Sequence, residues 1–439
     1  MNTKKMIVLA GAFGLAASVL AETPEVTNVS MVQPQRTRRV TITYTLSAQA
    51  VVTLDVQTNC VVNGETKWLS IGGEALWTTE GDVWKKVDAG SRTITWRPDK
   101  SPCAGHVIAA GGARAVVTAW ALDNTPNYMV VDIRPGAQAN SQKYYPAADY
   151  LPGGLLENED YRKYSIVMRK IMAQGISWNM GSLYETLRGS SETMHQVTMT
   201  NDYYIGVFEF TQAQWACVNA ARPTPANYSG EMRPVECVSH DEIRLCADQA
   251  ASDEVITANS WPRPPAENSF LGLLNARTGL DFDLPTEAQW EYACRAGNGE
   301  GCWGDGSTIS GNAEDANLNR LGRYGLNGGS TEGTAVVGTY APNSWGLYDM
   351  HGNVWEWCLD WRSNDYYPTS MAANGAPNIS LTDPTVRWDN TGWKVRIARG
   401  GSWYKNSAGY CRSANREDKS TSARDAEYGF RVVCRAGLD

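Results

Sequence analysis

Short runs in which apolar and polar residues alternate dominate the first third of the chain. They begin at Val40 (VTITYTL), Val51 (VVTLDVQ), Thr93 (TITW), Ala113 (ARAVVTAW) and Tyr128 (YMVVDI). A period of two places the apolar side chains on one face of a strand, and the Gly, Asn and Pro residues between the runs are turn formers. Residues 22–137 are therefore predicted to form an all-β antiparallel sandwich of the immunoglobulin or fibronectin kind.

A different pattern begins near residue 161, after a stretch at 138–160 whose small and polar composition is typical of a linker. Helices are predicted over 211–220, 239–251 and 286–296, because Thr or Ser stands at each N-cap position. The proline-containing stretch 252–268 interrupts this helical region and is expected to be a surface insertion. Beyond residue 297 the chain is predicted to be rich in loops, with short strands only.

The first 21 residues have the organisation of a secretory signal peptide. Lys4 and Lys5 precede an apolar stretch at 6–20, and small residues lead to a cleavage point before Glu22. The apolar stretch is too short for a membrane span. We therefore expect a secreted or periplasmic protein with no transmembrane anchor after cleavage.

Length and charge narrow the possible classes. A chain of 439 residues exceeds one typical core, so two domains are expected. Its formal charge of -8 becomes -10 when the two lysines of the signal peptide are removed, and no strong basic cluster is present elsewhere. Nucleic acid is therefore excluded as a partner. The aromatic residues are 17 Trp and 20 Tyr against 6 Phe, which suits a loop-rich core or a binding surface.

Ten cysteines in an exported chain are expected to form mainly disulfides. No CxxC pair supports a zinc ribbon or a thioredoxin-like site. Cys60 and Cys103 stand alone in the N-terminal third and are expected to pair with each other. The sequence does not fix the connectivity of the other eight.

The segment 346–361, GLYDMHGNVWEWCLDW, is the strongest candidate for a functional site. Asp349 and Glu356 flank a Gly-Asn turn, and calcium is commonly bound by such a mixture of carboxylate and carbonyl oxygens. The alternative is a strand end whose carboxylates face water. From the residues alone, both interpretations remain open.

Seven segments in order resemble the formylglycine-generating enzyme family, also called the sulfatase-modifying factor domain. They are MGS at 180, HQVTMTNDYYIGVFEFTQAQW at 195, DLPTEAQWEYACRAG at 283, GLYDMHGNVWEWCLDW at 346, RGGSW at 399, CRSANRE at 411 and GFRVV at 429. The resemblance covers residues 161–439. It implies an α+β domain with the irregular, C-type-lectin-like fold of that family, following the sandwich.

The resemblance also implies ligands and a disulfide. It implies a calcium site of Asp349, Gly352, Val354 and Glu356, and a second, weakened site beginning at Asn317 and Leu318, whose Asp position falls near Gly329. It places a disulfide between Cys294 and Cys434.

Members with the founding activity oxidise a sulfatase cysteine to formylglycine with oxygen and a copper(I) ion held by two cysteines, and thiolates suit copper(I). The first of these cysteines lies three residues beyond the serine of Gly-Gly-Ser, where this chain has Lys405 after Ser402. The second matches Cys411 in one alignment, whereas anchoring on Arg412 and Arg416 places Cys411 beyond it. Cys411 and Ser402 are the catalytic candidates, and Lys405 argues against the founding reaction.

Iron is not favoured either, because His106, His195, His240 and His351 show no HxxxH or HExxH spacing. An iron site of two His and a carboxylate from distant segments stays open as an alternative. If the protein is an enzyme, the resemblance implies an oxygen-dependent oxidoreductase.

The competing prediction is a calcium-stabilised, lectin-like module that binds a protein, peptide or glycan without chemistry. Its ligand cleft would be lined by Trp355, Trp357, Trp403, Tyr404, Arg412 and Arg416. Some relatives of this fold display variable residues after Gly-Gly-Ser-Trp, which here are Tyr404, Lys405, Asn406, Ser407 and Tyr410. The alternatives are that the two tryptophans at 355 and 357 belong to the core and that the arginines form salt bridges with Glu356 or Asp360.

Overall fold

The computed structural model describes residues 23–102, 111–185, 188–244, 264–329, 332–362, 380–382 and 395–437. Its N-terminal part contains two antiparallel sheets. The first has the order β1-β2-β7-β5, with β1 Val26–Val32, β2 Val40–Leu46, β7 Gly90–Trp96 and β5 Thr79–Gly81. The second has the order β4-β3-β6, with β4 Glu65–Ser70, β3 Ala50–Val62 and β6 Lys85–Val87, while β8 Ala113–Trp120 also pairs with β3.

Alternation in the sequence accounts for the burial of these strands. In β2, Val40, Ile42, Tyr44 and Leu46 are buried, while the residues between them are more exposed. These side chains share one hydrophobic cluster with buried residues of β3 and β7. The strands predicted from Val40, Val51, Thr93 and Ala113 are therefore present.

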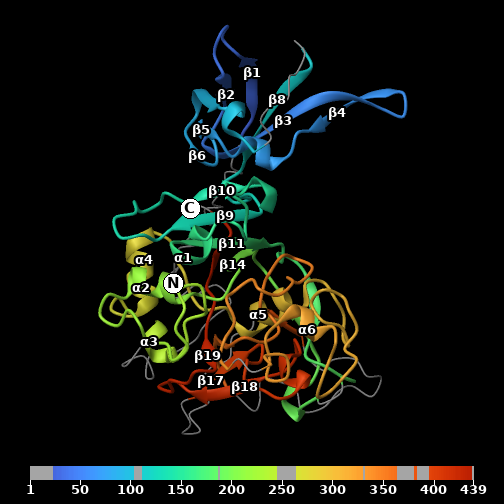
Figure 1. Ribbon diagram of the computed structural model, residues 1–439, viewed down its shortest axis with the longest axis vertical. Helices are drawn as coiled ribbons and strands as arrows, with labels where there is room; N and C mark the ends of the chain where they lie inside the picture. The colour runs from blue at the N-terminus through green and yellow to red at the C-terminus, as the bar shows by residue number, and fades with distance from the viewer. Residues whose placement is uncertain are drawn as a thin grey trace, which may run out of the picture.

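Strands β3 and β4 form a long hairpin that projects sideways from the N-terminal part (Figure 1). Its turn, Asn63-Gly64, has φ of 52° and 82°, the left-handed pair that two-residue hairpin turns require. Val61 on this hairpin is 74% exposed. The hairpin therefore has little contact with the rest of the molecule near its tip.

A five-stranded sheet lies below the N-terminal part in Figure 1. Its order is β10-β9-β11-β14-β20, with β10 Lys143–Tyr145, β9 Tyr128–Asp132, β11 Ser165–Ile171, β14 Tyr203–Gly206 and β20 Val433–Arg435. Two predictions are therefore wrong: β9 belongs to this sheet and not to the sandwich, and the predicted linker at 138–160 contains its strand β10. Alternation identifies a strand, but the partner of that strand depends on contacts distant in sequence.

The helices are short. They are α1 Asp160–Lys163, α2 Gln212–Val218, α3 His240–Arg244, α4 Phe270–Thr278, α5 Glu287–Arg295 and α6 Leu318–Leu321. Thr211 and Thr286 cap α2 and α5 as predicted, each within a capping box. The predicted helix at 239–251 begins as α3, and residues 245–263 lie outside the described residues. Helix α4 was not predicted. None of the helices in the described ranges is long and apolar enough to cross a membrane.

Two smaller sheets complete the domain. One joins β12 Ser177–Met180, β13 His195–Thr198 and β16 Ser380–Thr382, and the other has the order β18-β17-β15-β19. The bounds of the latter strands are β15 Trp355–Trp361, β17 Val395–Arg399, β18 Glu417–Ser420 and β19 Tyr428–Gly429. Every residue of β15 is buried.

The two parts of the chain share a hydrophobic cluster. Trp84 of the N-terminal part stacks on Tyr145, with ring centroids 5.3 Å apart. Val167, Val207 and Phe208 of the larger domain belong to the same cluster as Val40 and Ile42. The junction is therefore a packed interface.

Candidate functional site

The loop at 346–354 leads directly into β15 and holds the predicted calcium residues. Asp349 and Asn353 have positive φ angles of 58° and 68°, and the main-chain N–H of Asn353 donates to the carbonyl of Arg323 at 2.7 Å. Strand β15 then pairs with β17 on one side and β19 on the other. These contacts fix the loop in the centre of the domain.

Glu356 is held by Arg431 and Trp290, two side chains to which the sequence alone assigns no role. Its two carboxylate oxygens accept hydrogen bonds from Nη2 and Nε of Arg431, each at 2.6 Å, and Trp290 Nε1 donates to Oε2 at 2.7 Å. Glu356 and Arg431 are both fully buried. Their pairing compensates two charges that would otherwise be costly to bury.

Glu209 and Asp349 add two further carboxyl groups nearby. Glu209 accepts hydrogen bonds from Val354 N at 3.1 Å and Asn353 Nδ2 at 2.6 Å. Burial, followed by the charges of Asp349 and Glu356, raises the pKa of Glu209 well above its usual range. Burial likewise raises the pKa of Asp349 to about 7. A charged residue between two apolar ones, as in Phe208-Glu209-Phe210, is the sequence signal by which Glu209 could have been found.

The predicted calcium set fits in part. Asp349 Oδ2 accepts a hydrogen bond from Gly338 N at 2.7 Å, whereas its Oδ1 is buried without a hydrogen-bond partner. That oxygen has the character of an open cation ligand. Glu356 fits less well, because both of its oxygens are engaged by Arg431 and one also by Trp290. Asp349 is thus the member of the set that is suited to a cation.

At the predicted second site, Asn317 and Leu318 begin α6. Their main-chain N–H groups donate to Asp315 Oδ1 at 2.8 and 3.1 Å, and the side-chain amide of Asn317 donates to the carbonyl of Thr308. Asp315 therefore caps this short helix, and the segment forms a closed turn.

The two catalytic candidates are buried. Ser402 Oγ donates to Glu427 Oε2 at 2.5 Å, and Lys405 Nζ lies 3.7 Å from the same oxygen. Cys411 has no solvent exposure, and burial raises the pKa of its thiol well above the usual range. A Cβ at Gly401, whose φ is 80°, would lie 2.6 Å from Cys411 Sγ. The thiol is therefore packed against the backbone in its uncharged form.

The residues of the predicted cleft do not lie together on one surface. Trp355 and Trp357 are fully buried in the largest hydrophobic cluster, and Trp357 Nε1 donates to the carbonyl of Val238 at 3.1 Å. Their prediction as cleft residues is wrong, and the core alternative holds. Two residues apart on β15, both side chains project from the same face of the strand into this cluster, so neither ring reaches solvent.

Arg412 and Arg416 form salt bridges, but not with the predicted partners. Arg412 Nη1 lies 2.7 Å from Glu185 and 2.9 Å from Glu192, and Arg416 Nε lies 2.6 Å from Glu287. Both arginines therefore form structural salt bridges, and their prediction as ligand-binding residues is wrong. Arg399 forms ion pairs with Glu287 and Glu291 of α5, and Arg295, the last residue of α5, pairs with Glu291 within the helix.

The segment after Trp403 does form an exposed surface. Tyr404 is 60% exposed and Tyr410 is 43% exposed. Lys405 Nζ lies 5.5 Å from the centroid of the Tyr410 ring, and the Trp403 ring meets that of Tyr228 edge-on at 4.9 Å. We call these five residues the Tyr404 surface. Ser407 Oγ, which donates to the carbonyl of Asn312 at 2.6 Å, anchors the segment from below.

The described cysteines are all free thiols. Cys294 and Cys434 lie in different hydrophobic clusters, so the predicted disulfide between them is absent. Cys294 Sγ lies 3.3 Å from Ser413 Oγ. Cys434 is on β20, opposite Tyr204 of the neighbouring strand β14. Cys60 is free as well, and its predicted partner Cys103 lies outside the described residues.

The described histidines are buried at separate positions. His195 Nδ1 lies 3.0 Å from the carbonyl of Thr193, His351 Nδ1 lies 2.9 Å from that of Cys411, and His240 packs edge-on against Trp357. Within the described ranges, no group of three or more His, Cys, Asp or Glu side chains is arranged to hold a metal. His106 lies outside those ranges.

Residues 164–436 match the model of the sulfatase-modifying factor enzyme 1-like domain, which covers more than half of the chain. The protein belongs to this family. Formylglycine-generating enzyme from Streptomyces coelicolor is 37% identical over 163 residues, which are 35% of this chain and 47% of that enzyme. Chaperone protein LppX from Paenibacillus barcinonensis is 29% identical over 247 residues, or 51% and 76% of the two chains. Among solved structures, Treponema denticola variable protein 1 covers 62% of this chain and 96% of its own, with 25% identity and a TM-score of 0.45. The chain thus spans about half the length of the formylglycine-generating enzyme it matches.

Proposed function

We propose that this member of the family is a binding module that recognises an extended polypeptide through the Tyr404 surface and does not generate formylglycine. The observation that carries the proposal is the chemistry of Lys405, at the family's first copper position, and of Cys411, the candidate for the second. Lys405 replaces the first cysteine and lies 3.7 Å from Glu427, and Cys411 is buried as an uncharged thiol. Neither residue offers an accessible thiolate, which copper(I) requires.

The chemistry of the Tyr404 surface supports binding. Tyrosine presents a large contact area with few rotatable bonds, so ordering it costs little conformational entropy. Lys405 adds a charge over the Tyr410 ring, while Trp403 is fixed by donating from Nε1 to the carbonyl of Ala426 at 2.9 Å. A polypeptide supplies both apolar side chains and carboxylates for such a surface. The chaperone among the relatives is consistent with this choice.

Peptide display on the purified full chain tests the proposal. We expect selected peptides to lose at least tenfold in affinity on Tyr404→Ala or Tyr410→Ala. Tyr184→Ala is the control, because Tyr184 is 84% exposed but lies outside the Tyr404 surface. If peptide affinity is unchanged in both variants, the proposed site is wrong. If the protein selects no peptide but binds sugars on a glycan array, the proposed ligand is wrong. One equivalent of copper(I) bound with oxidation of a cysteine peptide to an aldehyde would overturn the non-catalytic assignment.

We also propose that the protein is exported and that residues 22–137 include an immunoglobulin- or fibronectin-like sandwich.

We further propose that calcium stabilises the domain through Asp349 and the 346–354 loop. The open Oδ1 of Asp349 supports this assignment. We expect the melting temperature of calcium-loaded protein to fall on chelation and to recover with added calcium, because a ligand that binds only the folded state stabilises it. The recovery should disappear in Asp349→Asn. Equal melting temperatures with and without calcium would refute this assignment.

A further inference from the structure

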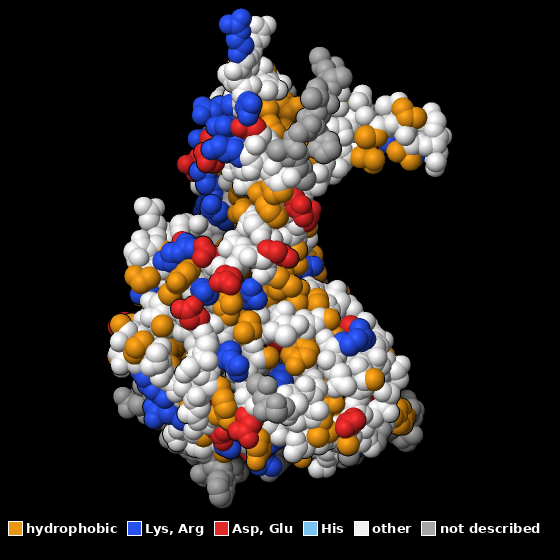
Figure 2. Space-filling model, in the orientation of Figure 1, with side chains coloured by type: hydrophobic (Ala, Val, Ile, Leu, Met, Phe, Trp, Pro, Cys, Tyr) orange, Lys and Arg blue, Asp and Glu red, His pale blue; other side chains and the backbone are white. Residues whose placement is uncertain are grey.

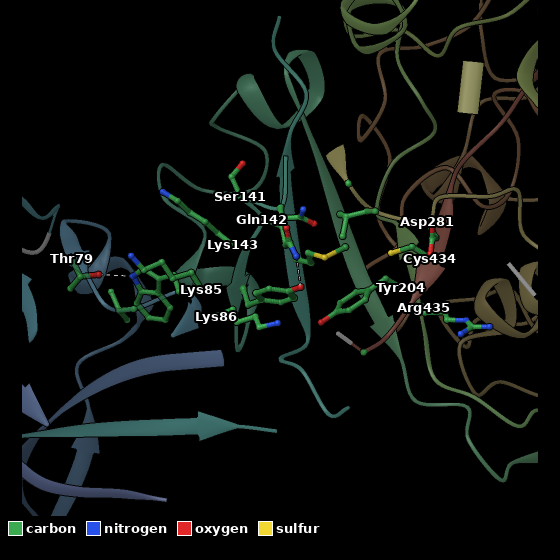
Figure 3. A pocket seen from close by; sticks show the side chains of 18 of the residues that line it. Thr79, Lys85, Lys86, Ser141, Gln142, Lys143, Tyr204, Asp281, Cys434 and Arg435 are labelled. Carbon is green, nitrogen blue, oxygen red and sulfur yellow. Dashed lines mark hydrogen bonds between the residues drawn. The ribbon is translucent and has the colours of Figure 1, made fainter. Parts of the chain in front are cut away.

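A cavity of about 640 Å³ lies at the junction between the N-terminal part and the five-stranded sheet (Figure 3). Met129, Tyr144, Tyr204 and Cys434 contribute to its lining from four different strands of that sheet. The opposite wall is the segment 79–86. Its volume falls within the range of small-molecule sites, which occur preferentially at domain interfaces.

The rim of the cavity carries more positive than negative charge. Its cations are Lys85, Lys86, Lys143 and Arg435, and its acids are Glu80 and Asp281. Asp82, in the same segment 79–86, lies 3.9 Å from Lys85 Nζ, so four cations face three acids and leave a local charge of +1, in a chain whose net charge is -8. Figure 2 shows Lys and Arg side chains gathered on the β5–β6 side of the N-terminal part. This local excess favours an anionic group at the mouth.

Gln142 gives the interior an unsatisfied polar group. It is 8% exposed, and its Nε2 donates to Tyr144 Oη at 3.2 Å. Its Oε1 is buried without a hydrogen-bond partner. If the amide is turned over, Oε1 accepts from the Tyr144 hydroxyl and Nε2 is left over instead, so one polar atom remains available in either orientation. An unpaired buried polar group is costly, and a ligand that satisfies it gains affinity.

We propose that this cavity binds a small amphiphilic anion. Its apolar body packs against Tyr144 and Met129, a polar atom of the ligand hydrogen-bonds the Gln142 amide, and its acidic group faces Lys86 and Lys143. This site goes beyond the proposed recognition of polypeptides, because it uses neither the Tyr404 surface nor the 346–354 loop. A ligand here contacts both parts of the chain and holds them together.

The first test is a fluorescence titration of the full chain with 8-anilinonaphthalene-1-sulfonate, an aromatic anion. We expect one saturable site, and at least tenfold weaker binding in the double variant Lys86→Glu/Lys143→Glu. Lys67→Glu is the control, because Lys67 lies on the distant β4 with half of its side chain exposed. The uncharged N-phenyl-1-naphthylamine should bind the wild type and the double variant equally. Absence of saturable binding of the sulfonate, or equal binding by wild type and double variant, would overturn the proposal.

A second variant isolates the role of Gln142. Gln142→Met keeps the length of the side chain and removes the unpaired amide, so the free protein should melt at a higher temperature while its affinity for the sulfonate falls several-fold. The opposite changes in stability and affinity distinguish a ligand contact from a structural role. Unchanged affinity in Gln142→Met would refute the hydrogen bond to the ligand.

Discussion

Glu356 and Arg431 illustrate how individual buried charges hold this domain together. Replacing Glu356 with Gln leaves the Arg431 guanidinium buried opposite a neutral group, and we expect a loss of about 3–5 kcal/mol in the free energy of unfolding. Arg362→Gln serves as the control. Arg362 pairs with Asp418 at 3.3 Å on the surface, where a loss below about 1 kcal/mol is expected. Urea denaturation measures the free energy of unfolding of both variants. Similar small losses in the two would show that the buried pair contributes little to stability.

His240 predicts a pH dependence at the same scale. Burial, followed by the charges of Arg396 and Arg244, lowers the pKa of His240 well below its usual value near 6.5. The unfolded chain therefore binds a proton between these two pKa values and the folded protein does not. Stability is complete above pH 6.5 and falls as the pH decreases. The fall in melting temperature from pH 7 to pH 5 should be smaller in His240→Gln, and an unchanged fall would contradict this origin.

Among the elements, α5 brings Glu287 and Glu291 to the arginines of β17 and the segment after it. Its N-cap is Thr286, which accepts a hydrogen bond from Gln289 N at 3.1 Å. We expect Thr286→Ala to cost about 1 kcal/mol, because one main-chain N–H loses its partner. Thr286→Ser retains the oxygen and should restore most of the stability in thermal denaturation. Equal destabilisation by both substitutions would indicate that packing of the methyl group is what matters.

The contrast between α5 and β9 explains what the sequence could predict. The cap of α5 is encoded within four residues, so its start was predicted. The partner of β9 is β11, more than thirty residues away, and alternation alone does not specify it. The same holds for the site: the segment 346–361 was identified as important, but the pairing of Glu356 with Arg431 joins residues 75 apart. Residues 355 and 357 were open to two interpretations because burial is a property of the whole sheet.

At the scale of the molecule, the shared hydrophobic cluster predicts cooperative unfolding. Trp84 and Tyr145 belong to different parts of the chain and lie in one cluster with Val167 and Val207. Removing the N-terminal part would expose these apolar side chains to water. We therefore expect a single calorimetric transition for the full chain, shifted as a whole by Trp84→Ala. Two transitions, of which only one responds to this substitution, would show that the parts unfold independently.

The projecting β3–β4 hairpin offers a practical consequence. The hairpin projects sideways from the N-terminal part, which lies at the opposite end of the molecule from β17 and β18 (Figure 1). A short affinity tag or a fluorophore grafted into the Asn63-Gly64 turn would replace no residue of the Tyr404 surface or of the cavity lining. Protein tethered through this handle would present its recognition face outward, so that immobilised chains could be screened for ligands in one defined orientation.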